Sequence, residues 1–155
     1  MGLTLAQSLL LAAAVALLAM MLYSHLGQPH RALCGYWAGD EEFKAEAGLA
    51  DIILWVEPAE RSVFGAPTHP AFLVASTEEG VVCSQPCAVS VDLGRGFWGR
   101  DAYEAPAALA FDEPAEAVWP AAVTLTLRPA DGTLAVRDGD TLYALFRKVS
   151  VDPPI

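Results

Sequence analysis

Positive charge is scarce in this chain of 155 residues, which has 9 Lys and Arg residues against 19 Asp and Glu residues. The formal net charge is −10, and no Lys or Arg precedes Arg31. An acidic surface repels phosphate groups, so the composition argues against nucleic acid as a direct partner. Binding to anionic lipid headgroups is disfavoured for the same reason.

Cysteine is also rare, with only Cys34, Cys83 and Cys87 in the chain. A small secreted domain held by disulfides usually has a larger and even number of cysteines. We therefore expect reduced and buried thiols, with a Cys83–Cys87 bridge as an open alternative. A zinc site built on that pair with His69 or Cys34 is a weaker alternative, because structural zinc sites usually contain paired ligand motifs. No metal or cofactor is predicted.

The sequence lacks a recognisable pair of nucleophile and base. His25 and His30 follow the N-terminal apolar segment closely, and His69 is expected to be a solvated loop residue. The glycines around Arg95 do not match a phosphate-binding signature. We therefore do not predict an enzyme.

What the chain does contain is a long apolar start, and residues 1–24 are predicted to form a transmembrane anchor. No charged side chain occurs between residues 3 and 23, and about 20 helical residues span the roughly 30 Å of a bilayer core. A cleaved signal peptide is the alternative, but such peptides start with positive charge and have a shorter apolar core. The apolar residues assigned to the anchor are Leu9, Leu10, Leu11, Val15, Leu17, Leu18, Met20, Met21 and Leu22.

The position of Arg31, after the apolar helix, favours a cytoplasmic location for the rest of the chain. Residues 25–32 are interpreted as a linker, and residues 33–155 as one β domain. Asp40 is positioned to cap a short helix that ends before Gly48. Residues 52–56 are apolar at every position, so this strand is expected to be covered on both faces.

Alternation of apolar and polar residues is clearest near the C-terminus, at 123–128, 134–136 and 142–146. Turn residues at 129–132 and at Asp138-Gly139 would join these strands into an antiparallel meander. Segment 105–120 is rich in Ala, Pro and Glu and is expected to be a long surface connection, with a weak strand at 107–111. In all, about eight short strands predict a mainly β fold, either a small antiparallel barrel or a sandwich, with one short helix.

Two groups of residues are candidate contacts with a protein partner. Phe97 and Trp98 lie among glycines in a predicted loop, and Trp is enriched at binding hot spots. Asp40, Glu41 and Glu42 form an acidic edge at the start of the short helix.

The segment Gly35-Tyr36-Trp37 resembles the Gly-x-Trp signature that opens the barrel of lipocalin-like proteins. This resemblance implies that Gly35 and Trp37 belong to the first strand of a barrel. It also implies that the Trp37 side chain closes the base of that barrel.

A second resemblance is to small membrane-anchored proteins encoded by large DNA viruses of algae and amoebae. It rests on the sequence from Leu33 to Phe43, on Ala47 to Asp51 and on Gly139-Asp140-Thr141-Leu142-Tyr143. Lys44 departs from the pattern, since a cysteine follows the Phe in such sequences. The resemblance implies a giant-virus virion protein whose β domain faces the capsid from an internal membrane. Assembly in the cytoplasm would agree with reduced thiols.

The leading hypothesis is therefore a structural virion component, a minor capsid protein that is anchored in the internal membrane and contacts capsid or other virion proteins. The alternative is a membrane-tethered, lipocalin-like carrier of a small apolar ligand. A carrier requires an empty apolar cavity inside its barrel, and eight strands leave room for one small ligand at most.

Overall fold

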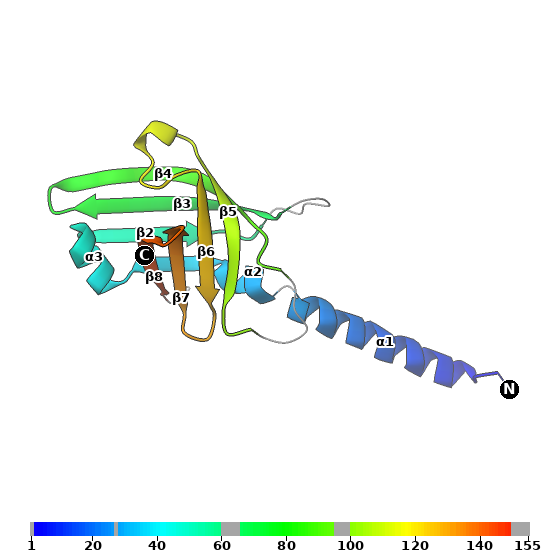
Figure 1. Cartoon of the computed structure of the whole chain (residues 1–155). Coiled ribbons are helices and arrows are strands. Elements are labelled where there is room, and N and C mark those ends of the chain that lie inside the picture. Colours follow the sequence, from blue (N-terminus) through cyan, green and yellow to red (C-terminus); the bar gives the residue numbers. More distant parts are fainter. Residues whose placement is uncertain (1, 27, 60–65, 95–99, 150–155) are drawn as a thin grey trace.

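The chain forms a long N-terminal helix that extends away from a closed β-barrel (Figure 1). The computed structural model describes residues 2–26, 28–59, 66–94 and 100–149, except for the side chains of residues 23–28. Phe97 and Trp98, the predicted aromatic contacts, therefore lie outside the described residues.

The helix α1, Leu5–Leu26, is long and apolar enough to cross a membrane. Its 22 residues correspond to about 33 Å at the usual helical rise. The protein buries none of the residues from Leu5 to Leu22, and a soluble core helix would be largely covered. The residues assigned to the anchor all lie in this helix.

The barrel has eight strands, and each pairs with its neighbour in the sequence until the last strand returns to the first. All eight pairings are antiparallel. This closure confirms the predicted barrel and excludes the sandwich. The strands are β1 (Gly35–Gly39), β2 (Asp51–Val56), β3 (Thr68–Thr77), β4 (Gly80–Val91), β5 (Tyr103–Phe111), β6 (Ala122–Arg128), β7 (Thr133–Asp138) and β8 (Thr141–Lys148).

Within the described ranges, three short helices accompany the barrel: α2 (Gln28–Leu33), α3 (Glu41–Ala47) and the 3-10 helix η1 (Pro114–Glu116). Because α2 precedes β1 and α3 follows it, these two helices lie at opposite ends of the barrel (Figure 1). We call the end at α2 the anchor end and the end at α3 the distal end. The β3–β4 turn also lies at the distal end, beside α3.

The barrel interior is filled by side chains that alternate along the strands, as the pleat of a strand requires. Trp37, Leu73, Leu127, Val136 and Phe146 are at most 1% exposed and belong to one apolar cluster. A second tryptophan, from the loop between β5 and β6, adds to this core, because the Trp119 ring packs edge-on against Phe146 with centroids 5.8 Å apart.

Several details differ from the sequence-based expectation. Strand β2 is covered on one side only, since Ile53 and Trp55 are 36% and 41% exposed on the outer face. Most of the expected linker is helical, because α1 continues to Leu26 and α2 begins at Gln28. The expected surface connection at 105–120 contains most of β5, whose inward side chains include the small residues Ala105 and Ala107. Small inward residues weaken the apolar alternation, so that only the weak strand at 107–111 was predicted within this segment.

Gly39 lies where β1 packs closely against β2, because a Cβ atom there would collide with the Ile52 side chain. We expect Gly39→Ala to lower the free energy of unfolding by about 1–3 kcal/mol, the usual cost of overpacking a core. Ala38→Val is the matched control, since Ala38 points outward on the same strand, and its effect should stay within about 0.5 kcal/mol. Chemical denaturation of the full chain in detergent micelles would compare them, and equal losses would contradict this packing.

Candidate functional site

The junction between α2 and the barrel is the part of the molecule where apolar packing and polar contacts converge. Pro29 and Leu33 are both less than 2% exposed, so α2 buries one side against the barrel. The indole Nε1 of Trp37, on β1, donates a hydrogen bond of 2.8 Å to the Leu33 carbonyl. Trp37 is fully buried. It therefore lies at the anchor end, against the helix that covers that end, where a base-closing tryptophan is expected.

A lysine from the last strand completes this closure. Lys148 Nζ, on β8, donates a hydrogen bond of 2.7 Å to the Ala32 carbonyl and lies 5.4 Å from the centroid of the Trp37 ring. A cation at this distance is attracted by the face of an aromatic ring. Burial lowers the pKa of Lys148 from its ordinary value. Lys148 thus joins the final turn of α2 to both strands that close the barrel.

Two histidines form the other half of the junction. His30 Nδ1, on α2, lies 3.2 Å from His69 Nε2, on β3, and the two rings are nearly parallel with centroids 5.4 Å apart. His69 Nδ1 is 2.9 Å from the carbonyl oxygen of Glu57. A carbonyl only accepts, so His69 Nδ1 carries a proton and, in the neutral ring, Nε2 accepts from His30. The pair therefore links α2 to the segment that follows β2.

His69 was expected to be a solvated loop residue, and this expectation is wrong, because His69 lies in β3 with 0% of its surface exposed. Burial lowers the pKa of the His69 imidazole from its ordinary value. Cys34 lies beside the pair, where its Sγ donates to the His30 carbonyl at 3.2 Å, and burial raises the pKa of this thiol. The Cys34 thiol is therefore protonated at neutral pH.

The buried imidazole makes the barrel sensitive to mild acid. An unfolded chain protonates its histidines near a pH of about 6.5, whereas folded His69 stays neutral to a lower pH because its pKa is lowered. The unfolded state then binds more protons, so stability decreases as the pH falls below that value. We expect the melting temperature of the full chain in detergent to be lower at pH 5 than at pH 7.5, because the unfolded state takes up more protons than the folded state over this range.

His69→Gln removes the titrating group and should flatten this pH dependence, whatever its effect on stability at pH 7.5. A wild-type melting temperature that does not change over this range would contradict the assignment. So would an unchanged slope in His69→Gln.

The hydrogen bond from Trp37 gives a second test of the junction. Trp37→Phe leaves the Leu33 carbonyl without its donor, and an unsatisfied buried carbonyl costs about 1–3 kcal/mol. We expect that loss in the free energy of unfolding, together with faster amide exchange in α2. Trp55→Phe is the matched control, because Trp55 is 41% exposed on the outer face and should change stability by less than about 0.5 kcal/mol. Equal effects of the two substitutions would contradict the role of Trp37.

Cys83 and Cys87 do not form the bridge that the sequence left open. All three cysteines are free thiols, and Cys83 and Cys87 both point inward along β4. Four residues of extended strand cover about 13 Å, whereas a disulfide needs Cα atoms within about 7 Å. Burial raises the pKa of Cys87 to about 11. Among the described residues, no group of three or more His, Cys, Asp or Glu side chains is placed to hold a metal ion.

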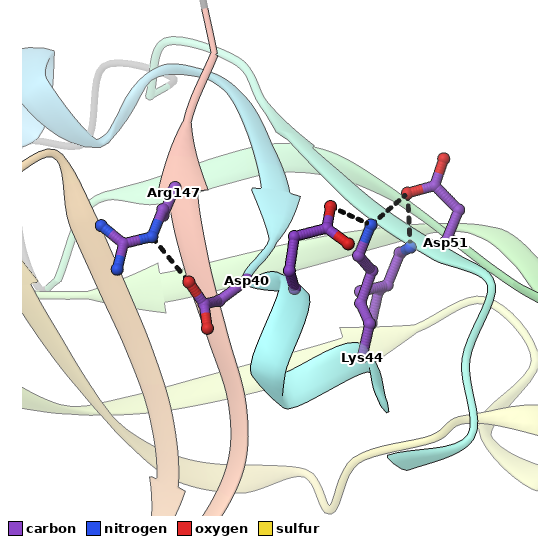
Figure 2. A network of polar contacts seen from close by, with 6 residues as sticks. Asp40, Lys44, Asp51 and Arg147 are labelled. Carbon is purple, nitrogen blue, oxygen red and sulfur yellow. Dashed lines mark hydrogen bonds and ion pairs between the residues drawn. The ribbon is translucent and has the colours of Figure 1, made fainter. Parts of the chain in front are cut away.

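The acidic edge predicted from the sequence lies at the distal end, and part of it is used within the protein (Figure 2). Asp40 is at the N-cap position of α3 but makes no capping hydrogen bond. Instead its Oδ1 accepts a hydrogen bond of 2.6 Å from Arg147 Nε, on β8. This contact holds the pKa of the Asp40 carboxyl below its ordinary value. Asp40 therefore connects the start of α3 to β8.

Glu41 and Glu42 are both exposed. The Glu41 carboxylate lies 2.9 Å from Lys44 Nζ, and the Glu41 side chain is 91% exposed. Lys44 also approaches the Asp51 carboxylate at 4.0 Å (Figure 2). Next to it, a surface cleft of about 550 Å³ separates the end of α3 from the β3–β4 turn, with Leu49, Glu78 and Glu79 among its lining residues. The distal end thus combines an open cleft with acidic side chains from two elements.

Comparison with known proteins adds no further constraint: no protein-family model, no curated protein and no solved structure matches this chain significantly. The chemistry described above therefore comes from the chain itself. Sequence reasoning missed the His30–His69 pair and the contact of Lys148 with Trp37. Each pair joins residues that are far apart in the chain, and no local spacing or motif connects them.

Proposed function

We propose that this chain is a structural component of a virus particle, a minor capsid protein that holds the shell close to an internal membrane. The observation that carries this proposal is the junction at the anchor end. The buried side of α2, the Trp37 and Lys148 contacts and the histidine pair fasten the segment after α1 to the barrel. A barrel attached in this way stays close to α1, as a protein that connects a membrane to a shell must do.

The distal end supplies the surface for the partner in this proposal. Glu41, Glu42, Glu78 and Glu79 are exposed there, on the side of the barrel opposite α2. A partner with a basic surface would complement this charge, and such complementarity increases the association rate and the specificity. The anchor raises the local concentration of the barrel at the shell, so that modest contacts are enough. The virus setting itself rests on the resemblance to anchored proteins of large DNA viruses.

The alternative, a carrier of a small apolar ligand, receives less support from the barrel interior. A carrier needs an apolar cavity, and large side chains of the apolar cluster occupy the interior, including Trp37, Trp119 and Phe146. Two pockets of the described part of the chain open on the outer surface, and all their lining residues except the buried Ala71 are exposed or half-buried. Co-purification of a small apolar molecule with the protein would instead support the carrier function.

Crosslinking of the native assembly, followed by mass spectrometry, tests the proposal. The chain has two lysines, Lys44 and Lys148, and 19 acidic residues, so a carboxyl-reactive crosslinker is the better reagent. We expect links from Glu41, Glu42, Glu78 or Glu79 to a capsid protein. Recovery of the chain in membranes with no link to any shell protein would contradict the proposal.

Charge-reversal variants test whether the partner binds at the distal end or at another part of the surface. Glu42→Lys combined with Glu79→Lys should strongly reduce the links that form through Glu41 and Glu78, which keep their carboxylates in this variant, because both changes oppose a basic partner. Glu104→Lys is the control, since Glu104 is exposed near the start of β5, towards the anchor end. Deletion of residues 1–26 should release a folded barrel from membranes. A released chain that fails to fold would contradict the view that the barrel is an independent unit.

A further inference from the structure

The outer face of the barrel carries a continuous row of apolar side chains across four strands. Tyr36 on β1 is registered with Trp55 on β2, Trp55 with Phe72 on β3, and Phe72 with Pro86 on β4. The rings of Tyr36 and Trp55 stack with centroids 5.3 Å apart and an angle of 11° between their planes. We call these four residues the aromatic row.

Three residues of this row, Trp55, Phe72 and Pro86, are exposed although they are apolar, and Tyr36 is half-buried. Trp55 is 41% exposed and Phe72 37%. Ile53, with 36% of its surface exposed, extends the apolar surface to the next outward position on β2. A shallow groove of about 250 Å³ lies along the row, lined by Trp55, Phe72 and Pro86 together with Glu57 and Pro70. Contiguous exposed apolar surface of this kind marks an interaction site.

The exterior opposite the row, on β5 and β6, has a different character. The outward residues of β6 include Thr124, Thr126 and Arg128. On β5 the outward residues begin with Glu104 and continue with small side chains, including Ala108 and Ala110. The exposed aromatic side chains of the described strands, Trp55 and Phe72, therefore lie in the row.

One half of the aromatic row, Tyr36 and Trp55, lies toward the anchor end, whereas Phe72 and Pro86 lie in the middle of the longer strands β3 and β4. Gly35, the first residue of β1, pairs with Val56, the last residue of β2, so Tyr36 and Trp55 are each one position from these strand ends. Only Gly27, the six residues of α2 and Cys34 separate the end of α1 from β1. At helical and extended rises, the chain from Leu26 to Tyr36 reaches at most about 22 Å. Tyr36 and its neighbour Trp55 therefore lie close to the end of α1, the helix that is long and apolar enough to cross a bilayer.

We propose that the aromatic row is a second membrane contact, which lies in the headgroup region of the same bilayer that α1 spans. Tyr and Trp are the residues enriched at membrane interfaces, because their rings are apolar and their edges polar. The formal charge of −10 selects against anionic headgroups, so the partner is a bilayer of zwitterionic lipid. With α1 as one attachment and the row as another, the barrel contacts the membrane at the part of β1 to β4 that carries the row, and the β3–β4 turn at the distal end stays away from it. This contact depends on the anchor and not on any capsid partner.

Tryptophan quenching by brominated lipid tests the contact in the full chain. The protein is reconstituted in phosphatidylcholine vesicles, with or without bromine on the acyl chains close to the headgroup. We expect brominated lipid to remove part of the emission of the wild-type chain, and we expect Trp55→Phe to abolish that part of the loss. The other three tryptophans are unchanged in this comparison, so the difference belongs to Trp55.

Two further variants place the reporter elsewhere in the Trp55→Phe background. Phe72→Trp keeps it in the row, whereas Val82→Trp moves it to a position at the distal end whose native side chain is 51% exposed. Emission from the Phe72→Trp reporter should be quenched and emission from the Val82→Trp reporter should not. Equal quenching of the two reporters, whether weak or strong, would overturn the proposal. So would quenching that increases when anionic phosphatidylglycerol is added.

Failure of this contact is distinguishable from failure of the anchor. Resistance of the chain to alkaline extraction from the vesicles reports on α1 alone. A chain that resists extraction but shows no quenching of Trp55 or of the Phe72→Trp reporter retains its anchor and lacks the second contact. That result would overturn the inference and leave the proposed structural role unaffected.

Discussion

The pairing of β1 with β8 is the contact on which the rest of the structure depends, because without it the eight strands would form an open sheet with two exposed edges. This seam is short, with registered pairs only at Trp37–Lys148, Ala38–Arg147 and Gly39–Phe146. Side-chain contacts strengthen it at both ends. Lys148 joins β8 to α2 at the anchor end, and the Asp40–Arg147 contact joins α3 to β8 at the distal end. Backbone hydrogen bonds from Asp40 to Leu145 and from Val149 to Tyr36 lie beside them.

The position of β1 in this seam also connects the two ends of the molecule. This strand has only five residues, and it separates the helix that covers the anchor end from the helix that carries the acidic edge. The Trp37 and Lys148 contacts attach α2 to β1 and β8, and the His30–His69 pair attaches it to β3. Under the proposed function, these contacts would keep the barrel, and a partner bound to it, close to the membrane.

Much of the fold followed from local sequence patterns. The apolar run predicted α1, and the turn residues at 129–132 and Asp138-Gly139 predicted the meander of β6, β7 and β8, which is confirmed. Gly48 does adopt the left-handed conformation, with φ of 71°, at the end of α3. The closure of the barrel was suggested only by the count of strands and by the resemblance at Gly35 and Trp37. Long-range pairings of this kind have no local signature, which is also why the His30–His69 contact was not anticipated.

The outer aromatic side chains explain why β2 was misread. Five consecutive apolar residues at 52–56 predict a strand that the protein buries on both faces. This prediction assumes that only other parts of the protein can cover the strand. In an anchored barrel a lipid interface offers a second kind of cover, and it accepts Trp and Tyr in particular. Under the membrane contact proposed above, lipid would cover Ile53 and Trp55, which are exposed on the outer face of the barrel. Such a contact would account for an apolar sequence in a strand that the protein itself covers on one face only.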